Sequence, residues 1–307
     1  MQSSVKSTTF EWIWTIRRAA RVAAFSIAVS GLLSGQQVTV TVNPSTPNFG
    51  RPVYDAIQQL QNLTTIPINY EDLQYNFAGD IQDISSLMTP AQQAAVPGAK
   101  VLVPKGGSFS VSVPVDPSTG KLADTLGVSN ALNAVIAAAQ AAGIVPGAFI
   151  VDSSQPGVFF VEPSRQHDNK GNTVAAQAAL ATPVTVAFQQ TVAQQVLDAI
   201  FQQVAQKTGV KFQAGSGTLA LAKPWTKVSI TATNEPAKYV IAKLLAAAYH
   251  VQPGTPPGVS YMALFEPQQR YYVFNMQVDA AALSPPNPPS PPQQPPTTGQ
   301  RLGKKGN

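Results

Sequence analysis

The residue types that most often carry chemistry are scarce in this chain and widely separated. The 307 residues include no cysteine and two histidines, His167 and His250. Neither histidine lies at the spacing of a zinc motif, and a chain without cysteine has no thiolate ligand or thiol nucleophile. We therefore expect no metal and no cofactor, and we expect both histidines to be structural.

Two acidic pairs, Glu71–Asp72 and Asp80–Asp83, could supply the two carboxylates that glycoside hydrolysis uses. Both pairs lie in a polar stretch that we expect to be exposed and solvated. No nucleophile elbow or phosphate-binding loop accompanies them. The prediction is that the chain is not an enzyme, and an envelope glycan hydrolase with paired carboxylates is the alternative.

The elements that must position these residues follow one order twice along the chain. The β-branched runs VTVTV (38–42) and VTVAF (184–188) each precede an amphipathic helix that contains Asp-Ala-Ile, and Gly209 predicts the end of the second helix. The expected apolar faces are Val53, Ala56, Ile57 and Leu60 in the first helix and Val196, Ile200 and Val204 in the second.

The second half of each copy repeats as well. Residues 108–115 and 227–233 alternate apolar and polar side chains, as half-buried strands do. Ser129 and Asn234 are then predicted to cap a second helix in each copy. Two strand-like segments close each copy, AFIVD with VFFVE and SYMALFE with RYYVFNM, and both pairs predict hairpins.

These patterns predict an α+β fold of two tandem β-α-β-β-α-β-β units. The first unit carries a long insertion, and a linker that starts with a polar turn cluster joins the two. The expected boundaries are a signal peptide at 1–36, the first unit at 37–163 with its insertion at 71–107, the linker at 164–183, the second unit at 184–283 and a disordered tail at 284–307.

The order of elements resembles the secretin and TonB short N-terminal domain. The segments that carry the resemblance are DAIFQQVAQKTGVKF, KVSITATNEPAKYVIAKLLAAA and RYYVFN, within residues 184–276. Residues 38–163 resemble the domain more loosely because of the insertion. The resemblance implies a small α+β periplasmic module, found in outer-membrane secretins and signal-transducing receptors. No secretin pore or receptor barrel follows it in this sequence.

The N-terminus has the pattern of a secretory signal. A stretch containing Arg17, Arg18 and Arg21 precedes a 12-residue apolar run, Val22–Leu33. That run is shorter than the roughly 18 residues of a membrane-spanning helix. We expect export to the periplasm or cell envelope, with cleavage near Gly35, although Leu33 is a poor fit to a cleavage site and an uncleaved anchor is the alternative.

The net charge of +5 belongs to the two ends of the chain. The first 36 residues and the last 24 are basic, whereas the body between them is close to neutral, which argues against a nucleic-acid-binding face. The proline-rich tail, 284–307, is expected to be extended and mobile. A wall-associated structural protein that is anchored through this tail is a further alternative.

The closing strands are apolar on both faces, although a two-layer unit needs only one apolar face for each strand. The second face is covered either within the chain, by the other copy or a longer loop, or by another protein. Aromatic residues are favoured anchors of protein interfaces. The candidate partner-binding residues are Tyr261, Tyr271, Tyr272 and Phe274.

The sequence thus predicts a non-catalytic docking module of the bacterial cell envelope, associated with secretin or pilus-type secretion or with envelope signalling. Its partner is expected to be an envelope protein whose identity the residues do not give. We expect no nucleic acid and no small-molecule cofactor, and association of the chain with itself is left open.

Overall fold

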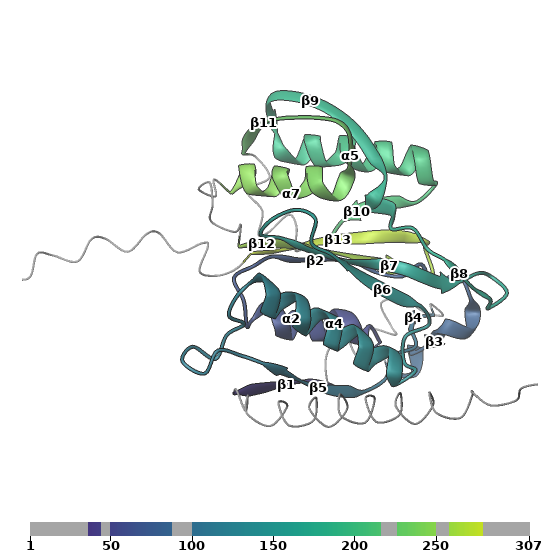
Figure 1. The fold of residues 1–307 in the computed structure, drawn as a ribbon. Helices are drawn as coiled ribbons and strands as arrows, with labels where there is room; N and C mark the ends of the chain where they lie inside the picture. The colour runs from purple at the N-terminus through teal and green to yellow at the C-terminus, as the bar shows by residue number, and fades with distance from the viewer. Residues whose placement is uncertain (1–35, 44–49, 88–99, 216–225, 250–257, 279–307) are drawn as a thin grey trace, which may run out of the picture. The chain divides into compact units, whose positions relative to one another are not determined.

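The computed structural model describes residues 36–43, 50–87, 100–215, 226–249 and 258–278. These residues form a mixed α+β fold with four α-helices and several β-sheets (Figure 1), so the predicted class is confirmed. The predicted tail and all but the last residue of the predicted signal peptide lie outside the described residues. The chain divides into two compact units, Met1–Thr64 with Gly79–Val151 and Thr65–Ala78 with Asp152–Asn307.

In the first unit, a two-stranded antiparallel ribbon carries two helices (Figure 1). Strand β1 (Gln37–Val42) pairs with β5 (Phe109–Pro114). Helix α2 (Pro52–Gln61) packs on β1, and α4 (Thr125–Ala141) packs on β5 and α2. Their apolar faces meet in a core that includes Val40, Val42, Ile57, Leu60, Val113, Leu132 and Val135.

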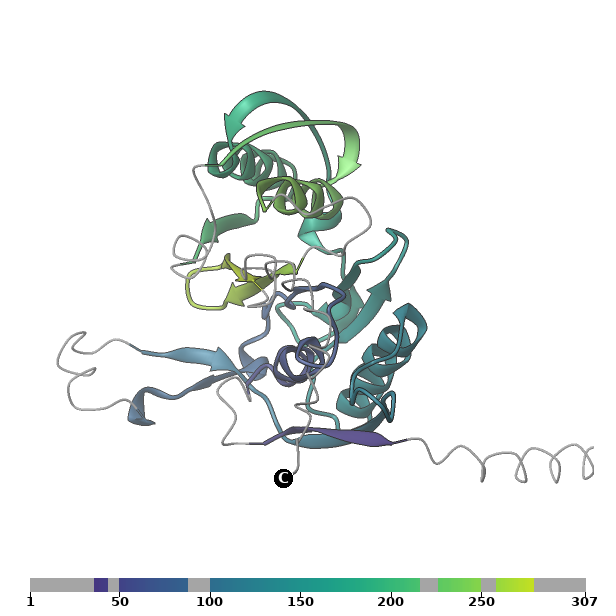
Figure 2. The same cartoon turned by 90° about the vertical axis from the view of Figure 1, so that its left-hand side faces the viewer.

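The predicted insertion contains short elements of its own. Strands β3 (Ile81–Asp83) and β4 (Leu102–Pro104) pair antiparallel and run side by side (Figure 2). A 3₁₀ turn, η2 (Ser85–Leu87), follows β3, and another, η1 (Ala78–Asp80), precedes it. The first unit ends at Val151, within strand β6 (Ala148–Asp152).

In the second unit, five strands form most of one sheet. Their order is β10 (Lys211–Ala214), β13 (Tyr271–Val278), β12 (Val259–Glu266), β2 (Ile68–Glu71) and β7 (Phe159–His167). β12 and β13 pair antiparallel, as the predicted hairpin requires, and the other three pairs are parallel. All four residues of β2 are buried, which is typical of a central strand covered on both faces.

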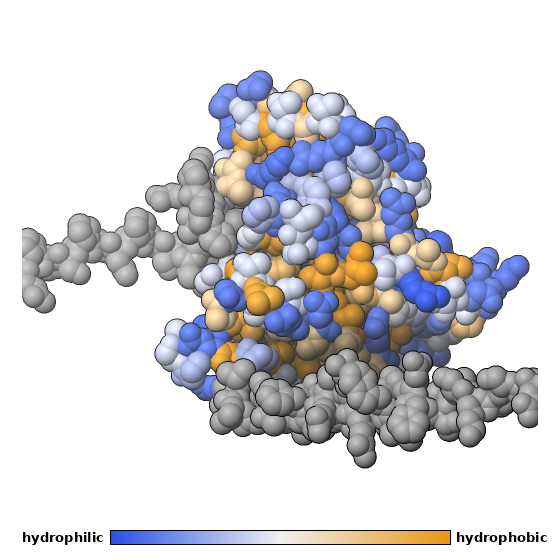
Figure 3. All heavy atoms as spheres, viewed as in Figure 1, coloured by the Kyte–Doolittle hydropathy of each residue, from blue (hydrophilic) through white to orange (hydrophobic). Residues whose placement is uncertain are grey.

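A second ribbon and two helices belong to the same unit. Strand β9 (Pro183–Val192) pairs antiparallel with β11 (Lys227–Pro236). Helix α5 (Ala193–Thr208) packs on β9 and α7 (Ala237–Ala248) packs on β11. The exposed residues of the outer ribbon face are mostly polar, and hydrophilic and hydrophobic residues are mixed over the outside of this unit in Figure 3. These exposed residues are Thr185, Ala187 and Gln189 on β9 and Lys227, Ser229, Thr231 and Thr233 on β11.

The segment between β7 and β9, predicted as a linker with a polar turn, is also folded. β7 continues to His167, and β8 (Thr173–Ala175) turns back to pair with it. The carboxylate of Asp168 accepts the backbone N–H groups of Lys170 and Asn172 in the turn between them. A 3₁₀ turn, η3 (Ala179–Ala181), then leads into β9.

Both predicted caps of the second helices are wrong, whereas the predicted end of α5 is confirmed. α4 begins before Ser129, because the carboxylate of Asp124 accepts the Gly127 N–H at 2.8 Å. Asn234 lies within β11 at a positive φ of 51°, and α7 starts after Pro236 without a side-chain cap. Gly209 ends α5 in the left-handed conformation, φ 74°, which glycine adopts without a Cβ clash.

Candidate functional site

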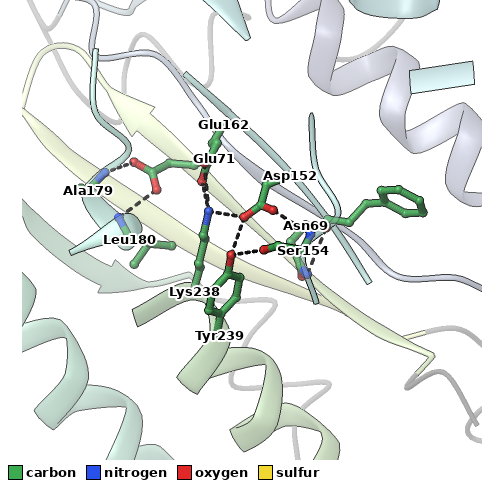
Figure 4. A network of polar contacts seen from close by, with 10 residues as sticks. Asn69, Glu71, Asp152, Ser154, Glu162, Ala179, Leu180, Lys238 and Tyr239 are labelled. Carbon is green, nitrogen blue, oxygen red and sulfur yellow. Dashed lines mark hydrogen bonds and ion pairs between the residues drawn. The ribbon is translucent and has the colours of Figure 1, made fainter. Parts of the chain in front are cut away.

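A cluster of ionisable side chains lies in the second unit, with Lys238 and Glu162 buried and Asp152 and Tyr239 half-buried (Figure 4). The Lys238 ammonium donates to Asp152 at 2.6 Å and to both carboxylate oxygens of Glu162 at 2.9 and 2.8 Å. The Tyr239 hydroxyl donates to Asp152 at 2.6 Å and also hydrogen-bonds the Ser154 hydroxyl. One cation is thus shared by two carboxylates, and the Lys238 side chain keeps only 6 % of its exposure.

The helix pattern explains why Lys238 is inside. It precedes Ile241 by three positions and Leu245 by seven, so it lies on the buried face of α7. It also lies in the first turn, where a cation is unfavourable for the helix dipole. The nearby carboxylates compensate for this charge. A lysine on the apolar face of a predicted helix was the signal that sequence reasoning missed, together with Glu162 at the end of an apolar run.

Hydrogen bonds within the cluster keep Lys238 and Asp152 charged. Burial alone would raise the pKa of Asp152, but hydrogen bonds from Lys238, Tyr239 and Ser154 hold it well below the usual range. Burial likewise opposes the charge of Lys238, yet hydrogen bonds to Asp152 and Glu162 raise its pKa. Burial, together with the hydrogen bond to Asp152, raises the pKa of Tyr239. Lys238 therefore stays protonated and Asp152 stays ionised at neutral pH.

Glu71, the last residue of β2, is bound differently. Its two carboxylate oxygens accept the backbone N–H groups of Ala179 and Leu180, at 2.5 and 3.0 Å, where η3 begins. Burial raises the pKa of Glu71 to about 8; the two N–H donors lower it, and the charge of Glu162 raises it further. This carboxyl group has no direct cation partner among the described side chains, and it fixes the segment that leads into β9.

The expectation that Glu71 and Asp72 are exposed is wrong, because both are buried. Asp72 Oδ1 accepts the hydroxyls of Tyr70 and Tyr75, each at 2.8 Å, and the N–H of Leu73 at 3.0 Å. In the first unit, Asp80 is also buried, whereas Asp83 is exposed and bonds Ser85. The carboxylates proposed as a catalytic pair at 71–72 are thus occupied by partners within the chain.

The chemistry open to the Lys238 cluster is limited by its own hydrogen bonds. A serine nucleophile at Ser154 would need a neighbouring base to take its proton. Tyr239 is a neutral phenol, Lys238 is a protonated ammonium held by two carboxylates, and Asp152 is a weak base because its pKa lies well below the usual range. With one cation held between two carboxylates, the geometry therefore fits a structural connection between α7, β7 and the end of β6.

Within the described residues, no group of three or more His, Asp or Glu is arranged to hold a metal ion. His167 meets the ring of Phe77 edge-on, with ring centroids 6.0 Å apart, and His250 lies outside the described residues. None of the helices in the described part of the chain is long and apolar enough to cross a membrane.

The four aromatic residues predicted to bind a partner separate into two groups. Tyr261, Tyr272 and Phe274 are buried in a stack of rings with Phe201 and Phe212. Buried side chains of this kind contribute to the core and are not available for surface contact. Tyr271 alone remains half-exposed.

Tyr271 belongs to a sheet face that we call the Tyr271 face. In one row across three strands, Tyr271 is paired with Lys211 on β10 and with Glu266 on β12. In the next row, Val273 is paired with Gln213 and Leu264. Each of these six residues is exposed or half-exposed, whereas Phe265, Tyr272 and Phe274 on the opposite face are buried.

Comparison of the chain with protein-family models, curated proteins and solved structures found no match. Function is therefore inferred from the fold, the Lys238 cluster and the Tyr271 face themselves.

Proposed function

We propose that the chain is an exported, non-catalytic docking protein of the bacterial cell envelope that binds another envelope protein. Its body consists of two tandem modules, 37–163 and 184–283, similar to the secretin and TonB short N-terminal domain. Such modules fit a role in secretin or pilus-type secretion or in envelope signalling. The observation that carries the proposal is the half-exposed Tyr271 face on the outside of a buried aromatic layer.

One pair of contacts supports the duplication. The Gln59 carboxamide on α2 accepts the N–H of Thr41 at 3.1 Å and donates to its C=O at 2.7 Å. The Gln203 carboxamide on α5 makes the same two bonds to Thr185, at 3.0 and 2.9 Å. Both pairs are 18 residues apart, and both members shift by 144 residues between the copies (185 − 41 and 203 − 59).

Strand pairing supports the duplication as well. β2 pairs parallel with β7, with Ile68 opposite Phe159, and β10 pairs parallel with β13, with Phe212 opposite Tyr272. Ile68 and Phe212 are again separated by 144 residues (212 − 68). Each copy also has an antiparallel ribbon formed by its first and third strands, if the strands of the insertion are left out.

The Tyr271 face has the composition of a docking surface. Tyrosine offers a large apolar ring with a polar end at a low entropy cost, and Val273 and Leu264 add apolar area beside it. Lys211 and Glu266 flank the ring with opposite charges, which suits a specific polar rim. The buried layer behind it keeps the ring in position without needing the partner.

The test is site-specific cross-linking from position 271 in living cells. A photoreactive phenylalanine analogue replaces Tyr271, and the matched control carries it at Thr231, which is exposed on the outer face of the β9–β11 ribbon. We expect a covalent adduct with an envelope protein from position 271 and none from position 231. Equal labelling from both positions, or no adduct from 271, contradicts docking through this face.

The substitution Tyr271→Asp gives a second readout. Because the side chain is half-exposed, the thermal midpoint should fall by only about 2 °C or less, while the adducted partner is no longer retained in a pull-down. If cross-linking from position 271 gives adducts only between two copies of the chain, the Tyr271 face binds a second copy and not an envelope partner. Export is tested separately by N-terminal sequencing of the envelope fraction, with cleavage expected near Gly35.

A further inference from the structure

The ribbon strands β1 and β9 each have an edge that needs protection. Within the described residues, β1 pairs only with β5, and β9 pairs only with β11. A strand paired on one side leaves a row of N–H and C=O groups free to pair with another chain. Proteins usually block such edges with charged side chains, prolines or bulges. Neither QVTVTV nor PVTVAFQQTV contains a charged residue; β9 has Pro183 at its start and two irregularities in its register with β11, whereas β1 pairs with β5 in regular register.

Glutamine side chains occupy both of these edges. A primary carboxamide has a C=O acceptor and N–H donors, the same groups as a peptide unit of a neighbouring strand. Gln59 engages both backbone groups of Thr41, and Gln203 engages both backbone groups of Thr185. In each case a helix residue thus supplies the two hydrogen bonds that an added strand would make at that residue.

A third contact extends this protection on β9. The Lys207 ammonium, four positions after Gln203 on α5, donates to the C=O of Pro183 at 2.6 Å. Pro183 and Thr185 are two positions apart, so their carbonyl groups point toward the same side of the strand. Helix α5 therefore covers consecutive acceptors along the β9 edge.

We propose that Gln59 and Gln203 close the β1 and β9 edges and prevent these strands from pairing with a second copy of this chain. A second copy is the occupant that fits best, because β9 is ten residues long and lacks charge, and its residues 184–189 alternate between covered and exposed positions. Two identical uncharged strands can pair antiparallel across a twofold axis without like-charge repulsion. The same contact in both copies indicates that both edges need the same protection.

The test uses the full chain with Gln203→Leu. Water can reach the freed Thr185 groups, since this contact is exposed, so the variant should fold. We expect light scattering after size exclusion to give a monomer for the wild type and a concentration-dependent dimer for the variant. Hydrogen exchange at the Thr185 amide, measured in the dilute monomer, should accelerate about tenfold, the loss of roughly one net hydrogen bond.

The matched control is Gln202→Leu, an equal change of composition at an exposed position of the same helix, which should stay monomeric with unchanged exchange. Adding Ala187→Lys to Gln203→Leu places a charge on the exposed face of β9 and should restore the monomer. Gln59→Leu tests the β1 edge independently, and this variant should also form a concentration-dependent dimer. A wild type that already dimerises through β9, or folded Gln203→Leu and Gln59→Leu variants that both stay monomeric, would overturn the proposal.

Discussion

Glu71 and Asp152 are two carboxylates of the same unit whose environments shift the pKa in opposite directions. The pKa of Glu71 rises to about 8 because burial dominates and its donors are uncharged backbone N–H groups. The pKa of Asp152 falls because an ammonium, a phenol and a serine donate to a less deeply buried group. Depth of burial and the charge of the hydrogen-bond donors therefore together set which carboxylate is ionised, since Lys238 donates to Asp152 but not to Glu71.

Glu162 connects the two environments. It accepts two hydrogen bonds from Lys238, and its charge also raises the pKa of Glu71. Lys238 balances one negative charge fully and a second only in part. A third ionised carboxylate would therefore be unfavourable, and a neutral Glu71 relieves this at neutral pH.

The largest effect is expected from removing the cation. Lys238→Met keeps the length of the side chain but leaves the carboxylates of Asp152 and Glu162 without the cation that they share. The free energy of unfolding should fall by about 3–5 kcal/mol, as for other buried pairs that lose one member. Denaturant unfolding at pH 7 measures it.

Lys243→Met on the same helix is the control. Lys243 pairs with Glu235 at 2.6 Å, but its side chain is 46 % exposed, so the loss should be below about 1 kcal/mol. Equal losses at Lys238 and Lys243 would mean that the buried cluster contributes no more than a surface pair.

The next effect is the pH dependence caused by Glu71. Its folded pKa, about 8, lies above the ordinary value of 4.5, so the folded state keeps a proton that the unfolded state releases. This contribution is fully present below about pH 4.5, is lost as pH rises toward 8 and is constant above it.

The slope should be at most about 1.4 kcal/mol per pH unit. Glu71→Gln removes it, so the stability difference between wild type and variant should change between pH 5 and 8. The difference cancels the titration of the histidines, which both proteins share. A difference independent of pH over that range would show that Glu71 is ionised in the folded protein.

The two carboxylates also mark the limit of sequence reasoning. Lys238 could be recognised as a core position, since helix period alone places it beside Ile241 and Leu245. Glu71 could not, because its partners Ala179 and Leu180 follow more than a hundred positions later. Because its neighbours in the sequence are polar, Glu71 was predicted to be exposed. The alternation of single strands was read correctly, because one residue in two faces the core regardless of distant contacts.

The repeated Asp-Ala-Ile shows a related error of register. It equates 55–57 with 198–200, a shift of 143 residues (198 − 55), whereas the glutamine contacts and the strand pairing share a shift of 144. Aligning the two copies by the repeated Asp-Ala-Ile therefore misplaces them by one residue relative to the alignment that the glutamine contacts and the strand pairing give. Tyr271 and Tyr272 pose the same problem, since adjacent strand residues face opposite sides and only the register distinguishes them.

Asp152 provides the opposite pH dependence. Its folded pKa is depressed, so its contribution is present above the ordinary value of 3.8 and is lost as pH falls below it. Asp152→Asn should flatten the acid side of the stability profile below pH 4 and leave the slope between pH 5 and 8 unchanged. If the change appeared in the higher range instead, the assignments of the two carboxylates would have to be exchanged.

The smallest effect is expected from Tyr239→Phe. The substitution removes the hydroxyl that bonds Asp152 and Ser154 but keeps the ring, which packs edge-on against Phe160 at 5.3 Å and lies 5.1 Å from the Lys238 ammonium. Loss of one hydrogen bond to a charged acceptor on a partly exposed side chain should lower the free energy of unfolding by about 1–1.5 kcal/mol.

In the Lys238→Met background, Tyr239→Phe should lower the free energy of unfolding by more than this, because Asp152 then depends on Tyr239 as its strongest remaining donor. A double-mutant cycle measures this coupling between the lysine and the phenol. A coupling of zero would mean that the phenol and the ammonium stabilise Asp152 independently, and the contrast with Glu71 would then rest on the ammonium alone.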